Sequence, residues 1–264
     1  MHFERFQSRL WETASLLIVA DGEAVLVDPG IAEGELAGIR ARLDALGARV
    51  THVLATHGDW DHVCGIAAFP EAVATMGPAT AERVTGDDGA RVLDAARRHG
   101  VAVAGPPRVD AVLRVGQAHQ IGPFTIETMA LPGHTPDGVA YRVRALDLLA
   151  VGDHLSRIEF PFVTSSAGYR ATLAGLIDVL RHDPPASVVP GHGPALTAEE
   201  ALEVAEADLA YLRALRAAVL GAGGDRTRAR AAALAVEPPR EASADLADMR
   251  AANVDRQLAE SLPG

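Results

Sequence analysis

The sequence predicts an α/β or mixed α+β fold that ends in a helical extension. The chain has 264 residues, of which 48% are hydrophobic, so it can bury one sizeable core. Along the first two thirds, short apolar runs alternate with segments rich in helix formers, which is the pattern of interleaved strands and helices. After Pro194 the apolar residues recur at helical spacing instead. We therefore expect one domain over 1–195 and a helical extension over 196–264.

The predicted strands are short runs rich in Val, Ile and Leu that are punctuated by Gly or Pro. They are too short for helices of ordinary length, and their composition favours extended structure. In chain order they cover 15–20, 24–28, 50–55, 72–76, 109–115, 124–131, 138–143, 146–151 and 186–189.

The predicted helices carry Ala, Glu, Arg and Leu at three- and four-residue spacing. A capping box at 197–200 begins the longest of them, and the glycine-rich stretch 221–224 ends it. The other helices are expected over 33–46, 80–99, 167–181, about 226–235 and about 242–262.

Charge and residue usage exclude several functions. The 24 basic and 35 acidic side chains give a net charge of −11, which disfavours nucleic acid and an anionic membrane as partners. The chain contains no Lys, which excludes a Schiff-base mechanism on lysine and a P-loop with its phosphate-binding lysine. Cys64 is the single cysteine, so an internal disulfide and a cysteine-based zinc site are excluded. We expect a small-molecule substrate, and the sequence is compatible with a homodimer.

The N-terminal segment predicts a cytoplasmic protein. Residues 1–5 contain no basic stretch of the kind that begins a signal peptide. The first apolar run, 16–20, is far shorter than a signal core or a membrane span.

Metal-ligand side chains follow four of the predicted strands, each within three residues. Loops at strand ends are where such side chains can converge, and a glycine beside a ligand lets the backbone come close to an ion. The cluster 57–62 follows the third strand, and Gly-His, Gly-Asp and Gly-His pairs follow three later ones. These loops supply seven candidate ligands, enough for two ions with open positions for water and substrate: His57, Asp59, Asp61, His62, His134, Asp153 and His192.

This ordered set, preceded by Asp28-Pro29-Gly30, resembles that of the metallo-β-lactamase-fold hydrolases, the superfamily that also contains glyoxalase II, acyl-homoserine lactonases and flavodiiron proteins. The resemblance covers about residues 16–193. It implies a four-layer αββα sandwich with two divalent metal ions at one edge. It also implies roles for the candidate ligands: one ion held by His57, Asp59 and His134, the other by Asp61, His62 and His192, and Asp153 bridging the two.

Asp59 departs from the pattern of most relatives, His-x-His-x-Asp-His, because it stands where the second imidazole belongs. Flavodiiron proteins resemble this sequence at that position, because they also have a carboxylate there. Two divalent ions, a bridging hydroxide and the three carboxylates of Asp59, Asp61 and Asp153 give the site a formal charge of zero. The usual pattern, with a histidine in place of Asp59, gives +1. A neutral site with a harder ligand favours Fe or Mn more than an all-imidazole site does. The predicted cofactors are therefore two divalent ions: zinc, or iron or manganese because of Asp59.

The predicted reaction is attack of a metal-bound hydroxide on an ester, thioester, lactone or amide carbonyl. Besides binding metal, Asp61 is expected to orient the hydroxide and relay a proton, while Asp153 holds both ions in place. Candidate hydrogen-bond donors to the substrate are Ser156, Tyr141 and Tyr169.

Two alternatives stay open. The first is an iron-dependent oxidoreductase of the same fold, against which the sequence offers no flavodoxin-like extension and no glycine-rich loop for FMN phosphate. The second is a non-catalytic metal-binding protein that uses the helical extension for protein contacts. The region 157–169 and the extension are expected to line the pocket mouth, which favours a partly apolar acyl substrate.

Overall fold

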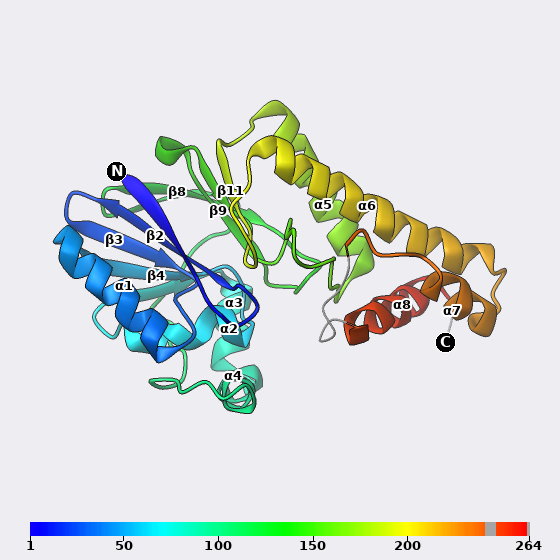
Figure 1. The fold of residues 1–264 in the computed structure, drawn as a ribbon, viewed down its shortest axis with the longest axis horizontal. Helices are drawn as coiled ribbons and strands as arrows, with labels where there is room; N and C mark the ends of the chain where they lie inside the picture. Colours follow the sequence, from blue (N-terminus) through cyan, green and yellow to red (C-terminus); the bar gives the residue numbers. More distant parts are fainter. Residues whose placement is uncertain (241–246, 263–264) are drawn as a thin grey trace.

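A computed structural model describes residues 1–240 and 247–262 of the chain (Figure 1). Within these residues, the strands form two sheets. The first sheet has the strand order β1 (His2–Gln7), β2 (Ala14–Ala20), β3 (Glu23–Val27), β4 (Arg49–Ala55), β5 (Val73–Met76) and β6 (Ala111–Val112). The second has the order β11 (Ser187–Val189), β10 (Leu148–Ala150), β9 (Val139–Val143), β8 (Phe124–Ala130) and β7 (Ala118–Ile121).

The core between the two sheets joins strands that lie far apart in sequence. Leu16 and Val25 of the first sheet belong to the same buried cluster as Phe124 and Tyr141 of the second. All seven residues of β2 are buried, because helices cover the other face of this strand. A strand covered on both faces has no polar side, which explains the continuous apolar run at this position.

Helices cover the outer faces of both sheets, so the fold is the four-layer αββα sandwich that the resemblance implies. One outer cluster joins the first sheet to the helices that follow it in the chain, and the other joins the second sheet to later helices. The helices of the first side are α1 (Glu33–Leu46), α2 (Trp60–Val63), η1 (Cys64–Ala68), α3 (Pro78–Thr85) and α4 (Asp87–Arg98). Those of the second side are α5 (Ser166–His182) and α6 (Ala198–Gly221), and η2 (Arg144–Leu146) joins β9 to β10.

The C-terminal helices pack at the end of the molecule opposite α1 (Figure 1). The capping box that begins α6 forms as predicted, with Thr197 Oγ1 accepting from the Glu200 amide at 3.2 Å. The helices α7 (Arg226–Leu234) and α8 (Ala247–Ser261) pack on α6, and all three share one buried cluster with α5. Over the described residues, none of the helices is long and apolar enough to cross a bilayer. The boundary at residue 195 stays a prediction.

Three predicted elements differ in their extent. The helix expected over 80–99 is two helices, because Gly86 has extended backbone between α3 and α4. The strand expected over 109–115 shortens to the two residues of β6, at the edge of its sheet. For the helix expected over 242–262, residues 242–246 lie outside the described part of the chain, and the remainder forms α8.

Two strands, β1 and β7, were not expected from the sequence. Both lie at the outer edge of a sheet, and most of their side chains are partly or fully exposed. Edge strands need little apolar surface, so their sequences lack the Val- and Ile-rich runs by which the central strands were predicted.

Strand direction brings the candidate ligands to one edge of the sandwich. β10 is parallel to β11 and antiparallel to β9, and β9 is antiparallel to β8, so β8, β10 and β11 all run in the same direction. Their carboxyl ends therefore lie together, and the loops that follow them carry His134, Asp153 and His192. The loop after β4 in the other sheet supplies the remaining candidates at the same edge.

Candidate metal centre

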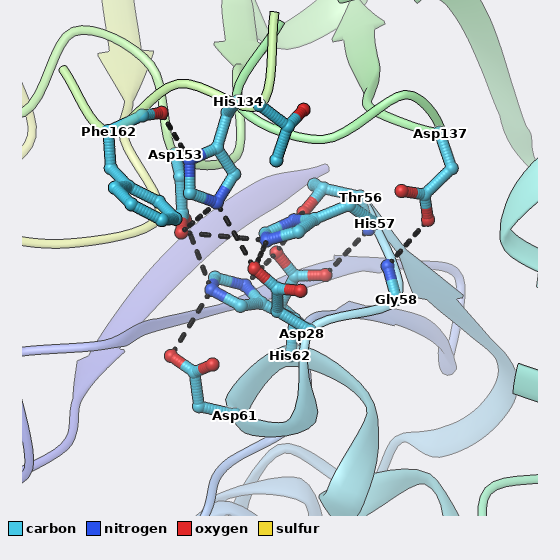
Figure 2. Close-up of polar contacts among 12 residues, drawn as sticks. Asp28, Thr56, His57, Gly58, Asp61, His62, His134, Asp137, Asp153 and Phe162 are labelled. Atoms are coloured by element: carbon cyan, nitrogen blue, oxygen red, sulfur yellow. Dashed lines mark hydrogen bonds and ion pairs between the residues drawn. The ribbon is translucent and has the colours of Figure 1, made fainter. Parts of the chain in front are cut away.

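Asp153 lies at the centre of the site, and Figure 2 shows it beside His57, His62 and His134. His192 is its fourth imidazole neighbour. Oδ2 of Asp153 is 3.1 Å from Nε2 of His134, 3.3 Å from Nε2 of His192 and 3.5 Å from Nε2 of His57. Its Oδ1 is 3.1 Å from Nε2 of His62. This central position fits the bridging role that the resemblance implies for Asp153.

The seven candidate ligands fall into two groups. Within each group the potential ligand atoms lie within 4.8 Å of one another. Asp61 joins the second group through Oδ2, which is 3.4 Å from Nε2 of His62 and 3.5 Å from Nε2 of His192. The structure therefore brings all seven together: His57, Asp59, His134 and Asp153 in the first group, and Asp61, His62 and His192 in the second.

Each of the four imidazoles directs Nε2 into the site because its Nδ1 is engaged elsewhere. Two of the Nδ1 partners are main-chain carbonyls, which only accept hydrogen bonds, so in those rings Nδ1 carries a proton and Nε2 is the nitrogen that faces the site. The four Nδ1 contacts are His57 with Thr56 Oγ1 (3.0 Å), His62 with Asp28 Oδ2 (2.9 Å), His134 with the Phe162 carbonyl (3.1 Å) and His192 with the Trp11 carbonyl (2.9 Å).

The chemistry of the candidate ligand atoms fits a pair of metal cations. Three buried atoms of the candidate ligands make no hydrogen bond within the described residues: Nε2 of His57, Nε2 of His62 and Oδ1 of Asp153. The last two lie 3.1 Å apart and count as a close ion-pair contact, not as a hydrogen bond. Such groups are costly to bury unless something binds their lone pairs. Burial alone would raise the pKa of Asp153, but the surrounding imidazoles hold it well below its usual range. Burial would likewise lower the pKa of His134, yet Asp153 and Asp59 raise it well above the usual value.

Asp28 holds the loop after β4 that carries the candidate ligands His57 to His62. Its Oδ1 accepts the Thr56 amide at 2.7 Å, and its Oδ2 accepts both the Thr56 hydroxyl at 2.7 Å and Nδ1 of His62. Gly191 is required at the same edge, because a Cβ there would lie 2.2 Å from Oδ1 of Asp153. These contacts position the candidate ligands before any ion binds.

Arg83 and Asp137 are two site residues that the sequence did not reveal. Arg83 Nη2 donates a hydrogen bond to Oδ1 of Asp59, and Nη1 donates to Oδ1 of Asp137 at 3.1 Å. The Gly58 amide donates to Oδ2 of Asp137 at 2.8 Å. The formal charge of zero calculated from the sequence therefore omits a cation, because the Arg83 guanidinium offsets the carboxylate of Asp59. Arg83 lies within a helix of ordinary surface composition, so no local pattern marks it.

A cavity of about 240 Å³ opens onto the candidate ligands. It is lined by aromatic residues from several segments, including Trp11, Trp60 and Phe162, and by Met249 of the C-terminal region. The expectation that 157–169 and the extension line the pocket is therefore confirmed for Phe160, Phe162 and Met249. The two tryptophans come from the β1–β2 loop and from α2, which the sequence did not connect with the pocket.

Of the three candidate donors to substrate, Ser156 is the one whose proton is available. Ser156 lines the cavity, and its Oγ accepts hydrogen bonds from the backbone amides of Ile158 and Glu159, at 3.2 and 3.1 Å. The Tyr169 hydroxyl lies at the cavity but donates to the Asp153 carbonyl at 3.1 Å. The prediction for Tyr141 is wrong, because its hydroxyl is buried and donates to the Ala55 carbonyl.

Two acidic residues also line this cavity. Asp208 is buried and paired with Arg240, and burial raises its pKa to about 7 against the effect of Arg240. Burial likewise raises the pKa of Glu159 to about 7. Neither residue was singled out from the sequence, because single carboxylates outside a motif resemble ordinary surface residues.

Comparisons with known proteins agree with this architecture. The family model of the metallo-beta-lactamase superfamily matches residues 9–224. A probable metallo-hydrolase of Bacillus subtilis, YqgX, is 26% identical over 181 residues, which are 67% of this chain and 83% of that protein. A hydroxyacylglutathione hydrolase of Anaeromyxobacter dehalogenans is 35% identical over 123 residues, which are 47% of this chain and only 39% of that enzyme.

The solved structure of TTHA1623 in a di-iron-bound form is similar with a TM-score of 0.58 and 26% identity, over 76% of this chain and 96% of that one. These relatives and the family match support a metal-dependent hydrolase in general and do not specify a substrate. The ordered ligand loops, the αββα sandwich and the match over most of the sequence lead to one conclusion. The chain belongs to the metallo-beta-lactamase superfamily.

Proposed function

We propose that this protein is a dinuclear metal-dependent hydrolase that cleaves an ester, thioester, lactone or amide bond of a small molecule. The observation that carries the proposal is the convergence of four Nε2 atoms on Asp153 at the floor of the cavity. One ion would be held by His57, Asp59 and His134, the other by Asp61, His62 and His192, with Asp153 shared. When bound, two divalent ions supply a water of lowered pKa and polarise a carbonyl.

The chain's own residues supply proton handling and orientation. Asp61 lines the cavity, and its Oδ2 is held by the Thr13 hydroxyl at 3.3 Å, which leaves Oδ1 to accept a proton from the attacking water. Ser156 is placed to donate its hydroxyl proton to the substrate, because both backbone contacts of its Oγ use lone pairs. The aromatic walls exclude water from the acyl group.

The proposed metals are zinc, or iron or manganese. A third carboxylate in the ligand set favours the harder ions. A di-iron-bound relative at 26% identity supports iron as a candidate and also keeps an iron-dependent oxidoreductase as the second candidate function.

The deciding experiment loads the protein separately with Zn, Mn and Fe, measures metal per chain, and assays each form on a panel of esters, thioesters, lactones and amides. We expect two ions per chain and turnover of at least one acyl class. A stoichiometry of one or less under metal-replete conditions would contradict the dinuclear site. Two ions without hydrolysis, together with reduction of oxygen by the iron form and an iron spectrum that changes on anaerobic reduction, would favour the oxidoreductase.

A further inference from the structure

The cavity above the candidate ligands has aromatic walls on several sides. The rings of Trp11 and Trp60 meet edge to face with centroids 5.5 Å apart, and Phe162 packs against His134 with centroids 5.9 Å apart. Phe160 and Tyr169 complete the wall. Aromatic faces attract apolar groups and also cations, because the ring face carries a partial negative charge.

The charge in this cavity, apart from the candidate ligands, is negative. Asp208 is neutralised by its contact with Arg240. Among the described residues, Glu159 has no arginine paired with its carboxylate: Oε1 lies 4.0 Å from Nδ1 of His192, and that nitrogen already donates to the Trp11 carbonyl. The Glu159 side chain is 18% exposed, so its carboxyl lies at the cavity with limited access to water.

Apart from the candidate ligands His134 and His192, no basic side chain among the described residues compensates Glu159 from the cavity wall. Among the described residues, none of those that line the cavity is an arginine. The chain contains no lysine, and the segment 241–246 contains neither lysine nor arginine. An anionic group on a substrate would therefore meet a carboxylate without a countercharge, whereas a cationic group would meet a carboxylate and aromatic faces together.

We propose that this cavity selects acyl substrates that carry a cationic ammonium group over neutral or anionic ones, with Glu159 as the specificity-determining residue. The proposal rests on the proposed hydrolase function and names its substrate class. In the reaction, water adds to the carbonyl, the bond from acyl carbon to the leaving oxygen breaks, and the products are a carboxylate, an ammonium alcohol and one proton. Hydroxyacylglutathione, whose tripeptide has a net negative charge at neutral pH, is expected to be a poor substrate.

A matched pair of esters tests this selection. Butyrylcholine and 3,3-dimethylbutyl butyrate have nearly the same shape and differ by a quaternary nitrogen in place of a carbon. With the metal-loaded protein at pH 8, we expect kcat/KM to favour butyrylcholine by about tenfold or more. Glu159→Gln should bring the ratio close to one, whereas Glu203→Gln, at an exposed site, should leave the ratio unchanged. Equal kcat/KM values for the two esters in the unmodified protein would overturn the proposal.

A binding measurement separates this proposal from the proposed function. Trp11 and Trp60 are the only two tryptophans of the chain and both line the cavity, so their fluorescence reports occupancy without turnover. We expect choline to bind the metal-loaded protein about tenfold more tightly than 3,3-dimethylbutan-1-ol, and Glu159→Gln to remove the difference. This result without hydrolysis of either ester would support cation selection and count against the hydrolase. Equal binding, no binding of either compound, or a preference unchanged in Glu159→Gln would overturn cation selection.

Discussion

Arg83 holds the outer oxygen of Asp59, so that the other oxygen of this carboxylate faces the candidate metal ligands. Nη2 of Arg83 donates to Oδ1 of Asp59, while Oδ2 lies 3.2 Å from Nε2 of His134 and 3.4 Å from Nε2 of His57. A carboxylate paired with a guanidinium has the same formal charge as a neutral imidazole. The replacement of histidine by Asp59 is therefore offset locally in charge.

We expect Arg83→Met to weaken binding of the first ion by about 10- to 100-fold, because loss of a group that orients a ligand has effects of this size. The substitution releases Asp59, which is 28% exposed, and removes the partner of Asp137, which holds the Gly58 amide. Titration calorimetry with Mn²⁺ measures the effect, with Arg49→Met as a surface control. Tighter binding in Arg83→Met would show that Arg83 acts mainly by repelling the ion.

Asp59→His should raise the preference for Zn over Mn, because it exchanges an anionic oxygen ligand for a softer neutral nitrogen. Absolute affinity should fall as well, since the new imidazole lies beside Arg83, and the double variant with Arg83→Met should recover part of it. Competition of the two ions in each protein measures the preference and cancels most effects on folding. If the Zn-to-Mn preference is unchanged, Asp59 does not bind metal.

Asp153→Ala should abolish binding of both ions and reduce turnover by more than tenfold, a barrier change above about 1.4 kcal/mol. The reason is that Asp153 contacts all four candidate histidines and has no role in the hydrophobic clusters. Circular dichroism should remain that of the unmodified protein, as it should for Asp94→Ala on the exposed side of α4. Retention of two ions per chain would remove Asp153 from the proposed bridge.

Arg240→Met should lower the free energy of unfolding by about 3 kcal/mol, because it leaves the buried carboxylate of Asp208 without its cation. The pKa of Asp208, already raised to about 7 by burial, should then rise further. A folded-state pKa above the unfolded value gives stability at low pH that is lost as pH rises, so the loss should be larger at pH 8 than at pH 5. Urea unfolding at both pH values tests this.

The double variant Asp208→Asn with Arg240→Met is the control for that prediction, because it removes both charges together. It should recover most of the stability and show little difference between pH 5 and pH 8. A double variant as unstable as Arg240→Met would mean that the Arg240 side chain contributes through its contact with the Glu159 carbonyl, not through charge.

The sequence by itself determined the central strands, most of the helices and the seven candidate ligands. Central strands such as β2 are covered on both faces, and that burial requires a continuous apolar run that is visible in the sequence. The ligands follow strand ends with glycine beside them, so Asp153 and His192 could be assigned to loops without knowledge of the fold. Local composition carried no such information for β1 and β7, whose exposed edges need few apolar residues.

The tertiary structure alone decided which residues surround the ligands. Arg83 is 24 positions from Asp59 and 54 positions from Asp137 in the chain, yet it bonds both of them. Trp11, Glu159 and Met249 come from three distant segments and meet at one cavity. A ligand loop is a local pattern that the chain carries within a few residues, whereas a countercharge or a cavity wall depends on which segments the packing of the sheets and helices brings together.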